Sequence, residues 1–391
     1  MIISLAYIFL IGMGASFIFK KLRIPNILAY IIVGMVLGPH YLNLIDKSIL
    51  NISSELRQIA LIIILIRAGF SLNISDLKKI GRPAILMCFI PACFEILGMI
   101  ILAPKLLGIS ILDAAITGSV VAAVSPAIIV PKMIQINEEG YGKKNSIPQI
   151  ILAGSSIDDI FVIVLFTGFT GLASNGDINL IEFLNIPVSI ILGTLLGIVV
   201  GYVLVKLFHK VHIRDTVKVV IMISMAFIFV TLEDYLKGII AISGLIAVIA
   251  MGMVINKKYS VLSNRITGKF EKLWLVASVM LFVLVGASVD ISYALNAGIK
   301  VVILIFTVLM FRIIGVFICF IKSKLTLKER VFCMIAYIPK ATVQAAIGGV
   351  PLSMGLDCGE IVLTVAVIAI LSTSTIGALG IDLTYKKLLK N

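Results

Sequence analysis

Two adjacent acids, Asp158 and Asp159, lie within AGSSIDDIFVIVLF, a stretch whose other residues are mostly apolar. Neighbouring residues on a helix point about 100° apart, so one positive partner cannot neutralise both carboxylates. The two acids raise each other's proton affinity, and burial raises it further. A carboxylate of this kind can hold either a proton or a small hard cation such as Na⁺ or Li⁺, which oxygen ligands suit. The pair therefore predicts a site where a proton and a cation compete for one aspartate.

Four more ionisable residues, Arg67, Glu95, Arg312 and Lys340, lie inside other apolar stretches. If these stretches are helices in a membrane, all six residues lie about 15 Å from the basic cluster at the end of their helix. A charge at that depth costs at least about 2.5–3.5 kcal/mol, so it normally pairs, faces water or carries ions. Salt bridges that join helices are the favoured interpretation for Arg67, Glu95 and Arg312, and ion carrying is favoured for the two aspartates.

Two apolar stretches contain residues that break helices. AAVSPAIIVPKM contains Pro126 and Pro131, and YIPKATVQAAIGGVPL contains Pro339 followed by a Gly-Gly pair and another proline. Proline removes a backbone donor, and unwound backbone at membrane depth is tolerated where it is buried in protein or lines a cavity. We expect both stretches to be interrupted, with ordinary proline kinks as the alternative. Lys340, next to Pro339, would place a cation beside the half-helix ends.

The composition excludes a soluble globular protein. Of the 391 residues, 60% are hydrophobic and 14% are charged, and the mean hydropathy is +1.17, so lipid must solvate most of the surface. Windows of roughly 20 apolar residues predict an all-α polytopic membrane protein with about 13 transmembrane helices. The predicted spans are 2–19, 24–39, 54–72, 83–104, 111–132, 147–173, 183–207, 217–236, 238–255, 273–289, 293–321, 330–351 and 360–382.

Lysine and arginine residues gather at alternate ends of these spans. One side carries 25 of the 33 basic residues and the other side carries 5, while the remaining 3 lie inside spans. Because cytoplasmic loops collect positive charge, this pattern predicts an outside N-terminus and a cytoplasmic C-terminus. The net charge of +13 then reflects topology and contact with anionic lipid, not nucleic-acid binding. We expect a multi-pass protein of the bacterial plasma (inner) membrane.

In this orientation the fifth span runs inward and the twelfth runs outward, so the two interrupted helices lie in opposite directions, one in each half. Such a pair is typical of inverted-repeat transporters, whose ion site lies where the broken helices cross. The sequence contains no phosphate-binding loop or dinucleotide motif. We therefore expect a transporter driven by ion gradients, with no cofactor and no enzymatic activity.

Gly193, Gly197 and Gly201 recur every fourth residue in the seventh span. A stripe of small residues lets helices approach closely. The stripe predicts a close contact, either of a linker helix or between copies of the chain.

Five motifs resemble those of the monovalent cation:proton antiporters, the sodium/proton exchangers of bacteria and animals. They are IPNILAYIIVGMVLGP, LIRAGFSLNISDLKK, VSPAIIVPKM, SSIDDI and IPKATVQAAIGGVP, which extend over nearly the whole chain. The last three, in this order and at this spacing, look most like the NHA-type branch that includes the animal solute carrier 9B proteins.

The resemblance implies a homodimer that works by elevator-type alternating access, in which a core slides against a scaffold. The core ion-transport domain would comprise residues 81–180 and 292–391. The scaffold and dimerisation panel would comprise residues 1–80 and 215–291, and a linker helix in residues 181–214 would join the two.

The resemblance also implies roles for individual residues. Asp159 would be the essential carrier of Na⁺ or Li⁺ and of the proton, with Asp158 beside it. Ser125 would lie at the crossing of the broken helices, and Lys340 would balance the charges of the half-helix ends.

The resemblance also implies an ion pair between Glu95 and Arg312. At position 312 the sequence departs from the electrogenic members of the family. Those with paired aspartates usually carry a lysine where this chain has Arg312. A lysine there can release a proton when Na⁺ binds, whereas arginine stays charged. Since only the aspartates can then titrate, the sequence favours electroneutral exchange of one cation for one proton.

Three other functions are compatible with parts of the pattern. A K⁺/H⁺ antiporter or K⁺ efflux system would use the same buried charges, although it would be expected to carry a nucleotide-sensing tail. An intramembrane aspartyl protease needs its two acids on different helices, in Y-D and G-x-G-D contexts, whereas here they are consecutive. A purely structural or sensing membrane protein is the remaining alternative.

Overall fold

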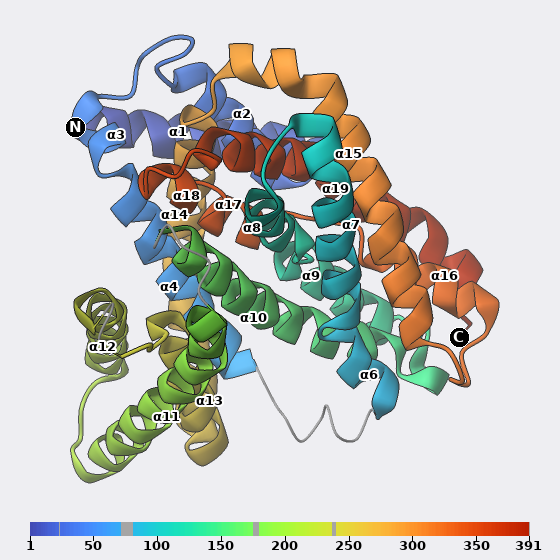
Figure 1. Ribbon diagram of the computed structural model, residues 1–391. Coiled ribbons are helices and arrows are strands. Elements are labelled where there is room, and N and C mark those ends of the chain that lie inside the picture. The colour runs from blue at the N-terminus through green and yellow to red at the C-terminus, as the bar shows by residue number, and fades with distance from the viewer. Residues whose placement is uncertain (23, 72–80, 175–179, 237–239, 391) are drawn as a thin grey trace.

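The computed structural model describes residues 1–22, 24–71, 81–174, 180–236 and 240–390, and every regular element in these ranges is a helix (Figure 1). The long uninterrupted helices are α1 (Ile2–Lys21), α4 (Ser53–Ser71), α10 (Ile147–Ser174), α11 (Leu180–Lys210), α12 (Asp215–Leu236), α14 (Ser260–Ala287), α15 (Ile291–Cys319) and α19 (Gly359–Leu388). The shorter helices are α2 (Asn26–Leu37), α3 (Lys47–Asn51), α13 (Gly244–Lys258) and the 3₁₀ turn η1 (Lys143–Asn145). The interrupted helices are α6 (Arg82–Met87) with α7 (Ile90–Leu107), α8 (Ile111–Ala122) with α9 (Pro126–Glu138), and α16 (Leu327–Ala336) with α17 (Thr342–Ile347) and α18 (Val350–Ser353).

Each predicted span overlaps a helix or an interrupted pair, which confirms the all-α membrane fold. Nine of the described segments are helical, long and apolar enough to cross a membrane. The other four predicted spans coincide with α2, α4, α13 and the run α16–α18, which are shorter or more polar. The number of crossings and their orientation remain predictions.

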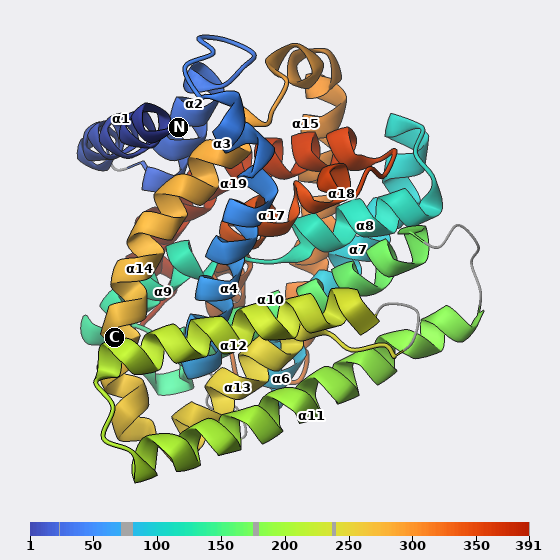
Figure 2. The same ribbon diagram turned by 90° about the vertical axis from the view of Figure 1, so that its left-hand side faces the viewer.

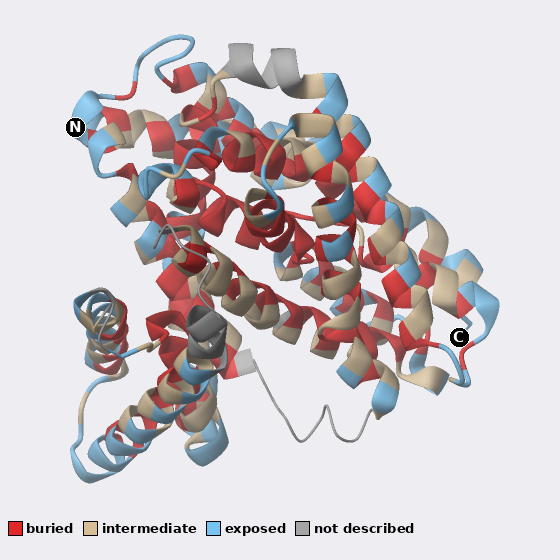
Figure 3. Cartoon of the chain, in the orientation of Figure 1, coloured by how far each residue is buried: buried red, intermediate tan, exposed pale blue. Residues whose placement is uncertain are grey.

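The helices pack in two groups. In the first, α14 lies along α2 and α4, while α13 packs between α4 and α11. In the second, α7 is flanked by α15 and α8, α10 packs on α8 and α9, and α19 packs on α15 and α16. Figure 2 shows α11, α12 and α13 together on one side of the molecule. Figure 3 shows that α8 and α17, near its centre, are almost entirely buried.

Glycine allows the backbones of α2 and α14 to touch. A Cβ atom added at Gly34 of α2 would collide with the carbonyl oxygen of Val283 in α14, and one added at Gly286 of α14 would collide with the carbonyl oxygen of Ile31. Backbone atoms cannot move aside as a flexible side chain can. The crossing of α2 and α14 therefore requires glycine on both helices.

Replacing Gly34 with valine should destabilise the protein by about 3 kcal/mol, because the added atoms overpack a contact made by backbone. The thermal unfolding midpoint in detergent measures the effect. Gly14→Val on α1 is the matched control, since a Cβ there meets nothing within 4 Å. Equal midpoints for the two variants would contradict the close contact between α2 and α14.

The predicted glycine stripe lies on α11 and contacts α13 of the same chain. A Cβ atom at Gly193 would collide with the backbone of Ser243, and one at Gly197 with the backbone of Ala247. The close approach is therefore made within the chain, between α13 and α11, which overlaps residues 181–214 where the resemblance implies a linker helix.

Helix α14 begins at Ser260, well before the predicted span 273–289. The sequence predicts a basic cytoplasmic loop here, because Arg265 and Lys272 lie in this region. Leu262, Ile266 and Phe270 recur every fourth residue and are fully buried, so the segment is an amphipathic helix whose basic residues occupy the other face. The helix therefore extends beyond the predicted span, because its buried apolar face begins at Leu262, before the run of apolar residues that predicts the span.

An interruption that the sequence does not predict separates α6 from α7. Helix α6 ends at Met87 and α7 begins at Ile90. Pro91 accounts for the break, because its ring would clash with the Met87 carbonyl in a continuous helix and it has no N–H to donate. The freed Met87 carbonyl accepts a hydrogen bond of 3.5 Å from the hydroxyl group of Tyr337.

Candidate ion-binding site

Two interrupted helices cross at the centre of the second group. Residues 123–125 are unwound between α8 and α9, and residues 337–341 are unwound between α16 and α17. The Ser125 N–H donates a hydrogen bond of 2.8 Å to the Pro339 carbonyl. The two predicted interruptions are therefore joined directly by their backbones.

The two prolines of the first interrupted helix behave differently. Pro126 is the first residue of α9, where its fixed φ and missing N–H are suited to a helix start. Pro131 lies inside α9, which continues through it, so the prediction that Pro131 breaks the helix was wrong. The hydrogen bond lost at Pro131 would have gone to the carbonyl of Ala127, an exposed residue, and the helix tolerates this loss near its N-terminus.

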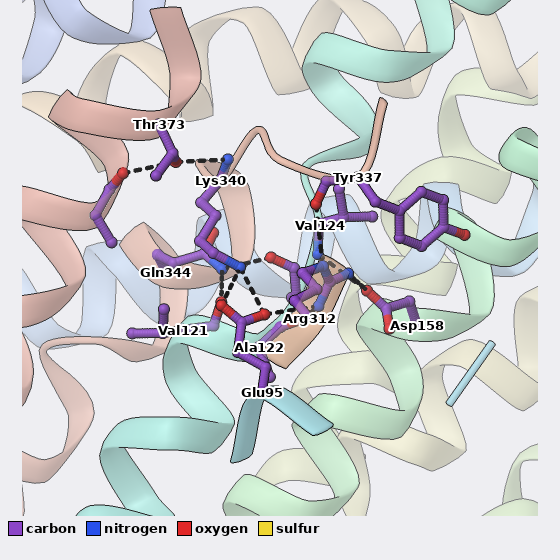
Figure 4. Close-up of polar contacts among 12 residues, drawn as sticks. Glu95, Val121, Ala122, Val124, Asp158, Arg312, Tyr337, Lys340, Gln344 and Thr373 are labelled. Carbon is purple, nitrogen blue, oxygen red and sulfur yellow. Dashed lines mark hydrogen bonds and ion pairs between the residues drawn. The ribbon is translucent and has the colours of Figure 1, made fainter. Parts of the chain in front are cut away.

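Asp158 lies in the middle of α10 and is fully buried. Its Oδ2 atom accepts a hydrogen bond of 3.0 Å from the Val124 N–H, in the unwound segment after α8. The same oxygen lies 2.7 Å from Nη2 of Arg312. Asp158 is thus bound both to the broken helix and to a guanidinium, as Figure 4 shows.

Arg312 of α15 is completely buried and joins four chain segments. Besides Asp158, its Nη1 atom lies 2.8 Å from Glu95 Oε2 and also donates to the carbonyl of Ala122, the last residue of α8. Its Nε atom donates to the Tyr337 carbonyl at 3.0 Å, and the guanidinium lies over the Tyr337 ring, 5.3 Å from the centroid. A planar guanidinium with five donors can make all these contacts at once.

The ammonium group of Lys340 contacts Glu95 of α7. Its Nζ atom is 2.7 Å from Glu95 Oε1 and 2.8 Å from Oε2, and both residues are fully buried. Glu95 therefore lies between two cations, one from each of α15 and the unwound segment after α16 (Figure 4). The implied pair of Glu95 with Arg312 is present, and Lys340 joins it.

These four residues balance in charge. Glu95 and Asp158 contribute two negative charges, and Arg312 and Lys340 contribute two positive charges, joined by ion pairs of 2.7–2.8 Å. Burial of charge is tolerated when every ion is paired and hydrogen-bonded. The four residues together thus carry no net charge, and we call them the charge-balanced cluster.

Asp159 lies next to this cluster and outside it. The residue is 7% exposed, and its buried Oδ1 atom has no hydrogen-bond partner within the described ranges. No ion pair joins Asp159 to another described residue. Asp159 is therefore the one acid of the pair that makes no ion pair with a described residue.

The Ser125 hydroxyl is buried without a hydrogen-bond partner among the described residues. Ser125 follows Val124, whose N–H donates a hydrogen bond to Asp158, and Asp158 precedes Asp159 in the sequence. Ser125 and Asp159 are therefore in the same region of the structure. A hydroxyl and a carboxylate oxygen are both ligands that hard cations accept.

Arg67, the sixth predicted charge, does not join the site. It is half-buried on α4, in the first group of helices, where it interacts electrostatically with Glu271 of α14. Arg67 therefore lies where α4 packs on α14, and it is not part of the crossing of the two interrupted helices.

The sequence did not single out Gln344 or Thr373. Gln344 of α17 donates from Nε2 to the carbonyls of Ala123, at 2.8 Å, and Val121, at 3.2 Å. Thr373 of α19 accepts a hydrogen bond of 3.2 Å from the Lys340 N–H. Neither residue is charged or breaks a helix, so the sequence signals that identify the other site residues are missing for both.

A family model described as "Sodium/hydrogen exchanger, transmembrane" matches residues 5–387, which is almost the entire chain. The chain belongs to the sodium/hydrogen exchanger family. The expected resemblance to monovalent cation:proton antiporters is thereby confirmed.

Two human proteins illustrate the similarity within the sodium/hydrogen exchangers. The chain is 32% identical to sodium/hydrogen exchanger 9B2 of Homo sapiens over 355 residues, covering 86% of the chain and 64% of the relative. It is 30% identical to sodium/hydrogen exchanger 9B1 of Homo sapiens over 350 residues, covering 86% and 67%. The chain thus spans about two-thirds of the length of these relatives.

The fold also matches a solved sodium/hydrogen exchanger. The sodium proton antiporter MjNhaP1 from Methanocaldococcus jannaschii superposes with a TM-score of 0.85 at 21% identity, covering 100% of this chain and 99% of the other. This match establishes the antiporter fold across the whole chain.

Proposed function

We propose that the protein is a secondary active antiporter that exchanges Na⁺ or Li⁺ for H⁺ by competition at Asp159. The proposal is based on the different partners of the two aspartates. Asp158 is engaged by Arg312 and by the Val124 N–H, whereas Asp159 has no ion-pair partner in the described part of the chain. A carboxylate that is buried without a partner must bind either a proton or a cation to be neutral.

The protonated and cation-bound states of Asp159 leave the same net charge in the site. If the site crosses the membrane only in these two states, movement of protons in one direction drives cations in the other. Na⁺ or Li⁺ would be bound by Asp159 with Ser125 and Asp158, which each have a buried oxygen without a partner among the described residues. The transported ions are substrates, and the proposed mechanism uses no cofactor.

Elevator-type movement is part of the proposal. The core would comprise the second group of helices and the panel the first group, with α11 as the linker. Support comes from the packing, because α17 is where the core contacts α4 and α14 of the panel. At this contact the guanidinium of Arg57 on α4 packs directly on Gly349, which follows α17.

The helix ends support the proposed orientation. Helices α1, α11, α13 and α19 correspond to four of the seven predicted inward-running spans, and each of these four carries basic residues in its last turn. Cations at these ends suit both the cytoplasmic side and the helix dipole. A bacterial plasma-membrane location, contact with anionic lipid and a homodimer formed through the panel are further parts of the proposal.

Liposomes containing the purified protein and a trapped pH dye test the exchange. With a pH gradient imposed, addition of Na⁺ or Li⁺ should dissipate the gradient, whereas empty liposomes should retain it. Dissipation by K⁺ alone would assign the protein to K⁺/H⁺ exchange. No response to any of the three cations would refute cation/proton antiport.

Exchange should be electroneutral, because Asp159 is the only charge of the site that changes between the two loaded states. Clamping the membrane potential of the liposomes with valinomycin and K⁺ should leave the initial rate of Na⁺-driven proton movement unchanged. Arg312→Lys is the informative comparison, since a lysine can lose its proton and would make the rate depend on potential. A wild-type rate that follows the imposed potential would contradict one-for-one exchange.

A further inference from the structure

Helix α8 ends inside the protein, at Ala122, without a following turn of helix. The last carbonyl groups of a helix have no partner within it, and at membrane depth no bulk water replaces the missing donors. Three successive carbonyls at this end, those of Val121, Ala122 and Ala123, are satisfied by side chains from other helices.

Two residues share these carbonyls. Arg312 donates to the middle one, that of Ala122, while Gln344 donates from its single Nε2 atom to the carbonyls on either side. Gln344 is 1% exposed and lies on α17, so it reaches from one interrupted helix to the other (Figure 4). The bond from the Ser125 N–H to the Pro339 carbonyl runs in the opposite direction, and the two links hold the crossing together.

The Ala123 carbonyl that Gln344 holds belongs to the same peptide group as the Val124 N–H. That N–H donates to Asp158 at 3.0 Å. A peptide group is planar and trans, so its C=O and N–H point in opposite directions and rotate together. Fixing the carbonyl at 2.8 Å from Gln344 therefore fixes the direction in which the N–H reaches Asp158.

The choice of a neutral amide matters for the charge count. The charge-balanced cluster already contains two acids and two bases. A second arginine or lysine at the carbonyl end of α8 would add a positive charge near the place where a cation must bind. A carboxamide supplies the donors without that charge.

We propose that Gln344 is a positioning residue of the ion site, which orients the Ala123–Val124 peptide so that its N–H holds Asp158. The inference rests on the proposed function, since it requires that Asp158 stays engaged while Asp159 exchanges ions. Gln344 touches neither aspartate and acts through the peptide group alone.

Gln344→Met tests this role, because methionine has a similar length and volume but no donor. Loss of the two hydrogen bonds should raise the apparent KM for Na⁺ and Li⁺ on the order of 10-fold. The maximal rate should change much less, because Asp159 still carries the ion. The concentration of Li⁺ that half-maximally raises the unfolding midpoint should increase by a similar factor, which measures binding without transport.

Gln149→Met is the matched control. Gln149 also makes a side-chain amide hydrogen bond, of 2.9 Å to Asn137, but at the η1 end of α10 and away from the crossing. Its KM should equal that of the wild type. Gln344→Asn keeps the amide on a shorter side chain and should give an intermediate KM, and it serves if Gln344→Met does not fold.

The outcomes separate the two proposals. A wild-type KM in both Gln344 variants, with only a lower unfolding midpoint, would make Gln344 a packing residue and overturn the inference while exchange stands. Absence of exchange by the wild-type protein would refute the proposed function, and the positioning role would fall with it.

Discussion

Asp159→Asn should reduce Na⁺- and Li⁺-driven proton movement to the level of empty liposomes. An amide cannot release a proton or carry the negative charge that binds a cation, so both loaded states are lost. The same variant should unfold at an equal or higher temperature than the wild type, because it removes a buried carboxylate that has no ion-pair partner in the described part of the chain. Lost transport with retained stability is the expected combination for a residue kept for function.

Asp382→Asn is the matched control for this variant. Asp382 is a half-exposed carboxylate on α19 that pairs with Lys132 on α9. Surface ion pairs contribute little to stability, so the substitution should leave both exchange and the unfolding midpoint nearly unchanged. Transport by Asp159→Asn at the rate of Asp382→Asn would show that another group carries the ion.

Arg312→Met should have the largest effect on stability. The substitution leaves Glu95 with Lys340 alone and leaves Asp158 without a cation, in a site where all these residues are fully buried. Removing one partner of a buried ion pair costs about 3–5 kcal/mol. The unfolding midpoint in detergent should fall on the order of 10 °C.

Two comparisons identify the cause of that loss. Arg312→Lys keeps the charge but cannot reproduce the forked contacts to Glu95 and Asp158, so its loss should be smaller. Adding Asp158→Asn to Arg312→Met should recover part of the stability, because it removes the carboxylate that the arginine neutralised. A double variant as unstable as the sum of the two single variants would contradict the direct pairing.

The features of the site that could be predicted are those with local signals. The prolines of VSPAIIVPKM and YIPKATV indicate interrupted helices because proline acts on its own backbone, wherever it lies in the fold. Even so, Pro126 begins a helix and Pro131 is tolerated inside one, since a proline's effect depends on which hydrogen bond it removes. The unexpected break at Pro91 follows the same local rule.

The partners of the buried charges depend on contacts distant in sequence. Arg312 meets Asp158 across 154 residues, and Lys340 meets Glu95 across 245. Composition and depth predict that such charges pair, but not which acid takes which base. The choice is important here, because the proposed exchange at Asp159 requires that Asp158 is the acid paired with Arg312.

Neutral residues of the site carry still weaker signals. Gln344 lies in an apolar span, and its side-chain amide is neither a buried charge nor a helix breaker, which are the two signals used to predict the site. Its importance emerges only when its Nε2 atom is found between two carbonyls at the end of another helix. At the start of α14 the charged residues are easily seen in the sequence and suggest a loop. The segment is nevertheless helical, because Leu262, Ile266 and Phe270 form a buried apolar face.

Proton release on cation binding tests the central claim most directly. Titration calorimetry of the purified protein with Li⁺ or Na⁺, in buffers of different ionisation enthalpy near the pH of half-maximal exchange, measures the protons released per bound cation. If Asp159 alone exchanges its proton for the ion, cation binding should release protons in the wild type and in Asp382→Asn, approaching one per cation where Asp159 is fully protonated. Asp159→Asn should release none. Undiminished proton release by Asp159→Asn, or cation binding by the protonated wild type without proton release, would contradict competition at this residue.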